Sequence, residues 1–178
     1  MCWAYITLWT ISREERNKTD MAMENTPREE IRRIVEAQRE FFRSGKTLDV
    51  KFRKESLRAL KRAMEKWEKP LADALWQDLH KSYEEAYLTE LSIVLGEIRN
   101  HISHLSKWAA PKRVCTPLKM FPSRSKVVQE PLGCSLIMAP WNYPVQLLLN
   151  PLVGAISAGC TAVLKPSPYV PHVSRVLE

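Results

Sequence analysis

The chain has 178 residues, of which 45% are hydrophobic and 26% are charged, as in an ordinary globular protein that buries its own core. Its five glycines and six tryptophans exclude collagen-like and low-complexity chains. The formal net charge of +7 would suit a nucleic-acid partner. However, no nucleic-acid-binding motif accompanies the charge, so we expect no such partner.

The first 25 residues contain an apolar segment, Met1–Ile11, that is too short to span a membrane. The first charged residue is Arg13, so the segment also lacks the basic start of a secretory signal. A cleaved or anchoring leader is the alternative interpretation. We predict that residues 1–25 are a disordered extension, that translation starts at Met21 or Met23, and that no membrane segment is present.

Residues 26–110 are predicted to form a helical layer. The first helix is expected to begin with a capping box, in which Thr26 caps the helix, Pro27 takes the first helical position and Glu29 reaches back. Gly45 is the expected end of this helix.

Apolar residues recur at helical spacing throughout this layer, and each set is expected to line one face of a helix. The sets are Ile31, Ile34, Val35, Phe41 and Phe42; Leu57, Leu60, Met64 and Trp67; Leu71, Leu75 and Leu79 after Pro70; and Leu88, Leu91, Leu95, Ile98, Ile102 and Leu105. We expect these faces to form the chain's own core. A partner helix from another protein is the alternative.

Residues 111–130 change character, because Pro111, Pro117 and Pro122 end helical structure. The segments Leu118–Phe121 and Lys126–Gln129 are predicted to be short strands of a connector hairpin. The acid-free basic residues of this stretch are either a solvated connector or a patch for an acidic partner.

Residues 131–178 are predicted to begin a parallel α/β sheet. The apolar run Cys134–Ala139 is expected to be a buried strand, Val145–Ala158 a helix interrupted at Pro151, and Thr161–Leu164 a second buried strand. Such a β-α-β unit places ligand groups at the carboxyl ends of its strands.

The turn after the first of these strands, Pro140–Pro144, lacks the glycine-rich G-x-G-x-x-G pattern of the usual dinucleotide fold. Neither Pro140 nor Pro144 can donate a backbone hydrogen bond, so this turn is not expected to cradle a pyrophosphate. A rigid turn that carries an amide side chain suits an oxyanion site, which makes Asn142 a candidate donor. Alternatively, Asn142 is a turn residue that bonds its own backbone.

The four cysteines and the histidines do not predict a metal site. No Cys-x-x-Cys pair occurs, and His101 and His104, one helical turn apart, have no third ligand in view. Cys134 and Cys160 are predicted to be small core residues, and Cys115 to be exposed. Because the cysteines look unpaired, we expect a reducing compartment and a cytoplasmic location.

Several blocks of this sequence, in this order and spacing, resemble the aldehyde dehydrogenase superfamily and in particular its class 3 branch. The blocks are Asp78-Leu79-His80-Lys81, Glu85-Ala86-Tyr87, Glu130-Pro131-Leu132-Gly133, Ala139-Pro140-Trp141-Asn142-Tyr143-Pro144, Leu147–Ile156 with its Asn150-Pro151 step, Ala158-Gly159 and Val163-Leu164-Lys165-Pro166-Ser167. The resemblance runs from about Ile31 to Glu178. It implies an incomplete α/β fold: amino-terminal helices followed by the first β-α-β of a Rossmann-like cofactor domain.

The resemblance also implies a chemistry, the oxidation of aldehydes to carboxylic acids with NAD or NADP. In the family, a cysteine thiolate attacks the aldehyde, hydride passes to the nicotinamide, and a glutamate helps to hydrolyse the thioester. Asn142 matches the oxyanion donor. The cofactor groove is implied to involve the backbone of Met138, Ala139, Pro140 and Trp141, and the side chain of Lys165 at the adenosine ribose or a 2′-phosphate.

Two departures from the family pattern shape the remaining expectations. Pro168 stands where the family usually has a ribose-binding glutamate, which predicts reduced preference for NAD over NADP or weak cofactor binding. The nucleophile and general base of the family lie downstream of the Lys-Pro-Ser segment. We therefore expect an inactive amino-terminal fragment of an enzyme that forms a homo-oligomer at full length. The alternative is a non-catalytic fragment that binds nucleotide or pairs with a subunit.

Overall fold

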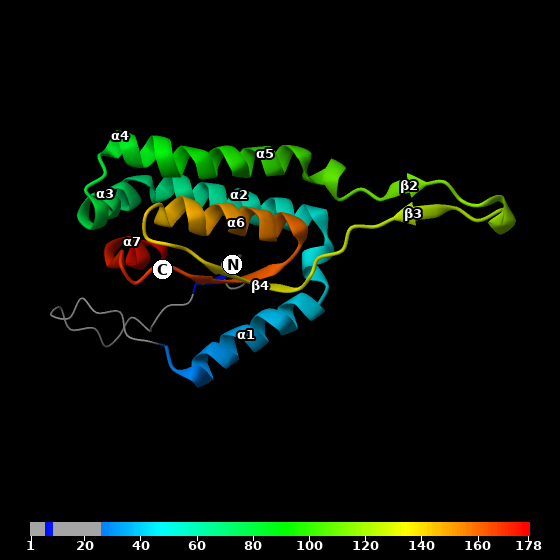
Figure 1. Cartoon of the computed structure of the whole chain (residues 1–178), viewed down its shortest axis with the longest axis horizontal. Coiled ribbons are helices and arrows are strands. Elements are labelled where there is room, and N and C mark those ends of the chain that lie inside the picture. Colours follow the sequence, from blue (N-terminus) through cyan, green and yellow to red (C-terminus); the bar gives the residue numbers. More distant parts are fainter. Residues whose placement is uncertain (1–5, 9–25) are drawn as a thin grey trace.

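The computed structural model describes residues 6–8 and 26–178, and Figure 1 shows their arrangement. The predicted disordered extension over residues 1–25 therefore lies outside the described residues, apart from three positions. Those three residues form strand β1 (Ile6–Leu8), so the stretch contains at least one element of secondary structure.

Helices make up most of the chain up to residue 108. They are α1 (Arg28–Arg43), the 3-10 turn η2 (Lys46–Leu48), α2 (Val50–Lys66), α3 (Glu68–Leu79), α4 (Tyr83–Ala86), the π-helical turn η3 (Tyr87–Leu91) and α5 (Ser92–Trp108). The remaining elements are β2 (Lys112–Val114), the 3-10 turn η4 (Leu118–Met120), β3 (Ser125–Val127), β4 (Cys134–Met138), α6 (Pro144–Ala158), β5 (Thr161–Lys165) and α7 (Pro171–Leu177).

A parallel sheet forms the middle layer, with the strand order β1-β5-β4. Helix α6 lies along one face of the sheet and α1 along the other (Figure 1). Helices α2 and α5 pack on α6 as a further layer. The sequence-based prediction of an α/β fold with a helical layer and one β-α-β unit is confirmed by this arrangement.

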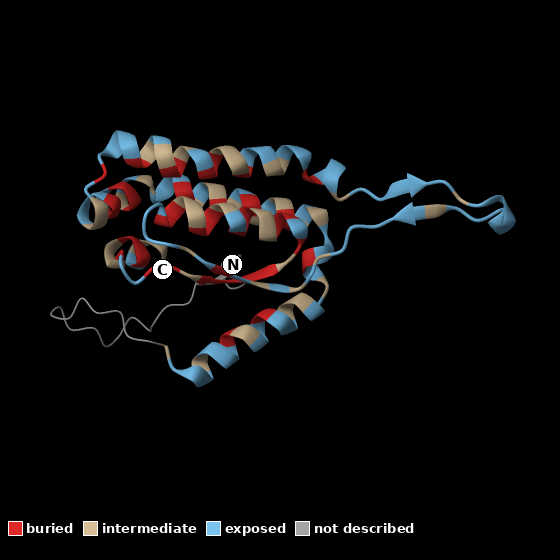
Figure 2. Cartoon of the chain, in the orientation of Figure 1, coloured by how far each residue is buried: buried red, intermediate tan, exposed pale blue. Residues whose placement is uncertain are grey.

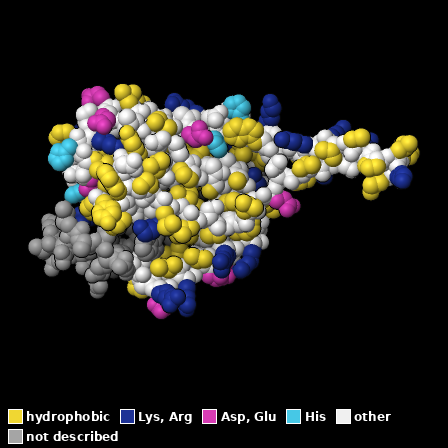
Figure 3. Space-filling view, viewed as in Figure 1, with side chains coloured by type: hydrophobic (Ala, Val, Ile, Leu, Met, Phe, Trp, Pro, Cys, Tyr) yellow, Lys and Arg dark blue, Asp and Glu magenta, His cyan; other side chains and the backbone are white. Residues whose placement is uncertain are grey.

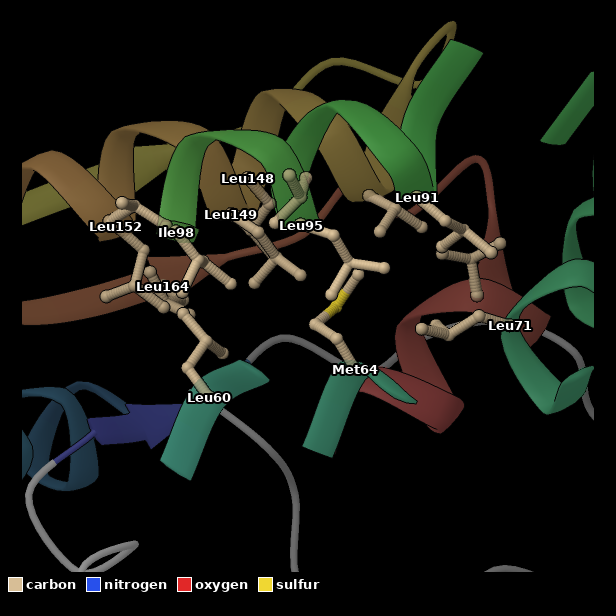
Figure 4. Packing of buried hydrophobic residues seen from close by; sticks show 14 of the residues in the cluster. Leu60, Met64, Leu71, Leu91, Leu95, Ile98, Leu148, Leu149, Leu152 and Leu164 are labelled. Atoms are coloured by element: carbon tan, nitrogen blue, oxygen red, sulfur yellow. The ribbon is translucent and has the colours of Figure 1, made fainter. Parts of the chain in front are cut away.

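The core lies between the helical layer and the sheet (Figure 4). Side chains from α2, α3, η3, α5 and α6 meet there, together with Leu164 of β5. The labelled helical ones are Leu60, Met64, Leu71, Leu91, Leu95, Ile98, Leu148, Leu149 and Leu152. Most of the predicted apolar faces therefore pack within the chain itself. This finding supports the intramolecular interpretation over a partner helix.

Three details of the helical layer differ from prediction. Helix α1 begins at Arg28 with Pro27 in the cap position and no side-chain cap, so the predicted capping box of Thr26 and Glu29 does not form. Trp67 is exposed because it follows the last residue of α2 rather than lying on its buried face. Leu88 is 65% exposed because it lies in the π-helical turn η3, where the winding no longer follows the α-helical spacing.

Residues 111–130 project from the body as a two-stranded arm (Figures 1 and 2). Its strands β2 and β3 pair antiparallel, so that Lys112 lies opposite Val127 and Val114 lies opposite Ser125. The predicted strand over Leu118–Phe121 is wrong, since these residues form η4 and the end of the arm. The paired residues lie outside this segment, and the connection between β2 and β3 contains η4.

Strand β4 lies at an edge of the described sheet, and this explains another wrong prediction. It pairs with β5 on one side only, and in β4 only Ile137 is buried. Cys134 is therefore exposed rather than part of the core, and Cys160 is only half-buried. By contrast, β5 lies between two strands, and its first four residues are buried as predicted.

Helix α6 is continuous through Pro151, where an interruption was predicted. Proline removes one hydrogen bond from the helix, but four leucine and valine side chains around it are buried in the core: Leu148, Leu149, Leu152 and Val153. Packing on both sides of Pro151 therefore keeps the two halves of the helix in line.

No helix within the described residues combines the length and the apolar composition that crossing a membrane requires.

Candidate functional site

The two segments that were predicted to bind a cofactor lie side by side. Strands β4 and β5 are parallel, and Met138 pairs with Lys165 at their carboxyl ends. The pairing continues one step into the turn, because the Ala139 N–H donates to the Lys165 carbonyl oxygen at 3.1 Å. The register of this sheet therefore joins the start of the Pro140–Pro144 turn to Lys165, the last residue of β5.

The turn presents most of its residues to solvent. Met138 is 65% exposed and Trp141 is 54% exposed, and Pro140 and Asn142 are exposed as well. Lys165 is half-buried. The five backbone and side-chain groups predicted for the cofactor, together with Asn142, thus share one edge of the sheet.

The Asn142 side chain forms no hydrogen bond within the described part of the chain; only its backbone carbonyl has a partner. The alternative in which Asn142 bonds its own backbone is therefore not realised in this structure. An exposed primary amide with free N–H groups can donate to an oxygen that approaches from solvent.

The backbone of the turn is held by Lys81, which follows α3. The Lys81 Nζ donates to the Asn142 carbonyl oxygen at 2.8 Å and lies 3.9 Å from the centre of the Tyr143 ring. It also forms an ion pair of 2.7 Å with Glu90 Oε1. Because the Lys81 and Glu90 side chains are 10% and 0% exposed, water has little access to this pair.

Glu90 continues the network into helix α6. Its Oε2 accepts hydrogen bonds from the backbone N–H groups of Val145 at 2.8 Å and Gln146 at 3.3 Å. Helix α6 has no cap from its own preceding residue, Tyr143. A carboxylate from η3 therefore caps the helix and complements the positive end of its dipole.

The segment after β5 is held in a similar way by Asp78 of α3. Asp78 accepts from the backbone N–H groups of His172 at 3.3 Å and Val173 at 2.8 Å, at the start of α7. His172 Nδ1 also lies 2.6 Å from Asp78 Oδ1. The short stretch from Asp78 to Lys81 thus touches the connections that follow both β4 and β5.

Between Asp78 and Lys81 the chain reverses direction at His80, which has a positive φ of 54°. This left-handed conformation ends α3 and is uncommon for residues other than glycine. It separates the two contacts, so that Asp78 on the helix faces α7 while Lys81 beyond it reaches the turn after β4.

These contacts bear directly on phosphate binding. The N-terminus of a helix that follows a parallel strand is the usual place for a nucleotide phosphate. In this chain a carboxylate already accepts from the first free N–H groups of α6, and another does so at α7. Neither helix start is therefore available to a pyrophosphate, which agrees with the absence of a glycine-rich turn.

Reasoning from the sequence did not find the roles of Lys81 and Glu90. Lys81 was noted as part of a family-like block, and Glu90 was not singled out. No sequence signal pointed to Glu90, because it is next to Leu91 in the chain but lies outside the predicted apolar face of Leu88, Leu91 and Leu95.

Other candidates are placed away from this edge. Cys134 begins β4 and Cys160 directly precedes β5, so both lie at the amino ends of these strands, whereas Asn142 follows the carboxyl end of β4. Cys115 is on the arm. Among the described residues, no group of three or more metal-binding side chains comes together, and His101 instead contacts Ser157 and Glu97.

Comparison with known proteins places this site in a family context. Residues 11–178 match the family model described as Aldehyde dehydrogenase family. The 4,4'-diaponeurosporen-aldehyde dehydrogenase of Staphylococcus aureus is 46% identical over 138 residues, which cover 78% of this chain and 30% of that protein. Aldehyde dehydrogenase family 3 member F1 of Arabidopsis thaliana is 40% identical over 156 residues, which cover 88% of this chain and 31% of that protein.

A solved structure of Staphylococcus aureus AldH in a substrate-bound state superposes with a TM-score of 0.80 at 44% identity, covering 83% of this chain and 32% of that one. The chain thus spans about a third of the length of the relatives it matches.

Proposed function

The chain belongs to the aldehyde dehydrogenase family, on its class 3-like branch, and we propose that it supplies the amino-terminal part of an enzyme that oxidises aldehydes to carboxylic acids with NAD or NADP. Its relatives are aldehyde dehydrogenases, and the family uses NAD or NADP. The observation that carries the proposal is the free amide of Asn142 on a turn whose backbone is fixed by buried groups.

We assign Asn142 the role of oxyanion donor. When a nucleophile attacks an aldehyde, the carbonyl oxygen gains negative charge, and a donor already in place stabilises that charge without reorganisation. The Asn142 amide needs no bond to be broken before it donates, because its side chain has no partner within the described residues. The nucleophile must come from outside the described residues, since Cys134 and Cys160 lie at the amino ends of β4 and β5, away from Asn142.

The carboxyl ends of β4 and β5 would bind a dinucleotide cofactor. The phosphates of that cofactor would be bound by another part of the enzyme. The backbone of Met138, Ala139, Pro140 and Trp141 would line the groove, and the Lys165 ammonium would bind the adenosine ribose or a 2′-phosphate. When bound, NAD or NADP accepts the hydride that the aldehyde loses. The capped starts of α6 and α7 keep the phosphates away from both helices.

Pro168 supports a further point about cofactor choice. It is exposed, lies three positions after Lys165, and supplies neither a carboxylate nor a backbone N–H. Because no acidic side chain stands there, nothing at this position repels a 2′-phosphate. We therefore propose that NADP is accepted at least as well as NAD.

The arm supports assembly with other copies of the chain. Its tip carries two highly exposed apolar side chains, Leu118 at 88% and Phe121 at 82% exposure. Figure 3 shows that hydrophobic and basic side chains both occur along the arm. Exposed apolar groups on a two-stranded arm without a core of its own favour pairing with another surface. Light scattering should show a smaller assembly for Phe121→Asp than for the unchanged protein.

The proposed function is tested by expressing this chain joined to the carboxyl-terminal part of an aldehyde dehydrogenase of the family. The reduction of NAD and NADP is then measured in the presence of fatty and aromatic aldehydes. Aldehyde-dependent formation of the reduced cofactor supports the proposal. A folded protein that binds neither cofactor and oxidises no aldehyde would favour the alternative, a subunit-pairing fragment.

A further inference from the structure

The ion pair of Lys81 and Glu90 is the one buried ion pair among the described residues whose two members both contact the Pro140–Pro144 turn or the helix it opens. Lys81 precedes its partner Asn142 by 61 residues in the chain, and Glu90 precedes its partner Val145 by 55 residues. Charged side chains are seldom buried to this degree unless they are paired. The question is therefore what the pair does for the turn.

We propose that Lys81 and Glu90 are positioning residues that fix the direction of the Asn142 side chain, an inference that rests on the proposed oxyanion role of Asn142. Lys81 holds the carbonyl oxygen of Asn142, and Glu90 holds the first N–H groups after Pro144. The peptide group that follows Asn142 and the first peptide groups of α6 are thereby tied to one buried ion pair. These contacts hold the Asn142 backbone, and with it the direction of the Cα–Cβ bond from which the amide extends.

Three features make the pair suited to this task. Water has little access to it, so its electrostatic interactions are stronger than those of a surface pair. Lys81 Nζ is also placed over the Tyr143 ring at 3.9 Å, which restricts the residue next to Asn142. Finally, Glu90 belongs to η3, and π-helical turns of this kind are frequent at functional sites.

A purely structural role would be different in kind. If the pair only stabilised the fold, its replacement by neutral groups would change the stability and leave the turnover of folded protein unchanged. If it positions Asn142, the same replacement would lower kcat in protein that remains folded. A misplacement of about 1 Å can cost about a hundredfold in rate.

The decisive variant changes both partners, as Lys81→Met with Glu90→Gln. Changing Lys81 alone would leave an unpaired buried carboxylate and could unfold the protein. The double variant leaves no buried charge, and the glutamine oxygen can still accept from Val145 and Gln146. It removes the hydrogen bond to the Asn142 carbonyl. Lys61→Met is the matched control, because it breaks the exposed Lys61–Glu65 pair on α2.

The kinetics are measured in a full-length enzyme that contains this chain. We expect the double variant to lose tenfold to a hundredfold in kcat, whereas its KM for the aldehyde should stay within about twofold of that of the unchanged enzyme. The control should keep its kcat. A double variant that is folded and turns over like the unchanged enzyme would overturn the inference. A loss seen only in KM would overturn it as well, because the oxyanion forms after the aldehyde is bound.

A second measurement keeps the inference separate from the proposed function. Hydrogen exchange followed by mass spectrometry on the 178-residue chain reads the backbone around the turn without any catalysis. We expect faster exchange over residues 141–147 in the double variant and no change in the control. If the unchanged enzyme oxidises no aldehyde, the proposed function fails. If exchange over this turn does not change, the positioning role fails.

Discussion

The connections that follow β4 and β5 are built on the same plan, yet they differ in what they present. Each leads from a parallel strand into a helix with proline at its first position, and each helix start is capped by a carboxylate from the α3–η3 region. After β5, Asp78 acts with a single histidine neighbour. After β4, Glu90 acts together with a buried lysine that also binds the turn itself.

The β4 connection shows how side chains from a distant part of the chain can hold a turn that contains no glycine. The β5 connection needs only to start its helix, and one carboxylate is sufficient for that. The β4 connection carries Asn142, and there the Asn142 carbonyl oxygen and the first N–H groups of α6 are tied to a buried ion pair. An exposed amide is useful for stabilising an oxyanion only if it is already in place, so the additional fixation coincides with the proposed chemistry.

The largest expected effect is on stability. Glu90→Ala leaves Lys81 buried without its partner and removes the cap of α6, and we expect it to lower the free energy of unfolding by about 3–5 kcal/mol. Urea denaturation of the chain followed by circular dichroism measures this. The control Glu65→Ala, which breaks an exposed pair, should change the value by less than about 1 kcal/mol. A loss from Glu90→Ala no larger than that from the control would show that the pair does not hold the turn.

The next effect is on catalysis. Asn142→Ala removes the proposed oxyanion donor, and the barrier should rise by about 2.7–4 kcal/mol, which is a hundredfold or greater loss in kcat. Its stability should be unchanged, because the side chain is exposed and has no partner within the described residues. Steady-state kinetics of the enzyme that includes this chain measure the effect, with the exposed Asn100→Ala as the control. Near-normal turnover of Asn142→Ala would reject the oxyanion assignment.

A smaller effect is expected at the second connection. Asp78→Ala removes the cap of α7 but leaves no buried lysine unpaired, so the free energy of unfolding should fall by about 0.5–2 kcal/mol. The same denaturation experiment gives the comparison with Glu90→Ala. If Asp78→Ala proved the more destabilising of the two, the two connections would differ in the opposite sense from the one inferred.

The smallest effect concerns an exposed pair, the counterpart of the buried one. On α1, the hydrogen bond from Arg33 lowers the pKa of Glu30. A lowered folded-state pKa adds stability above the ordinary pKa of a glutamate, and this contribution is lost as the pH falls through the lowered value. Arg33→Met should therefore give a slightly lower Tm at neutral pH, and the difference should vanish in acid. A difference in Tm that persists unchanged in strong acid would contradict this.

Local patterns predicted the helices well, and they also predicted that β4 and β5 are strands of a parallel sheet. The faces that carry Leu57, Leu75 and Ile98 are buried as their spacing indicates. Predictions failed where a neighbouring element decides the outcome. Cys134 reads as buried within an apolar run, but β4 has a partner strand on one side only. Leu88 reads as part of a helical face, but the π-helical turn alters the winding.

The candidate site divides in the same way. Asn142 could be singled out from its place in the rigid turn after a predicted strand, and Lys165 from the resemblance to the family. The parallel pairing of β4 and β5 explains why the two segments meet. Lys81 and Glu90 could not be singled out, because their contacts join residues more than 50 positions apart in the chain. A single sequence shows periodicity and motifs, but it does not show which distant charges will be buried together.

The most direct test of the link between the buried pair and Asn142 is a cycle of kcat values in the same enzyme. It compares Asn142→Ala, the double variant Lys81→Met with Glu90→Gln, and the combination of all three changes. If the pair acts through Asn142, the combined variant should have the kcat of Asn142→Ala within about twofold, because nothing remains to be positioned. If the losses instead multiply, the pair and Asn142 contribute independently, and the positioning role is contradicted.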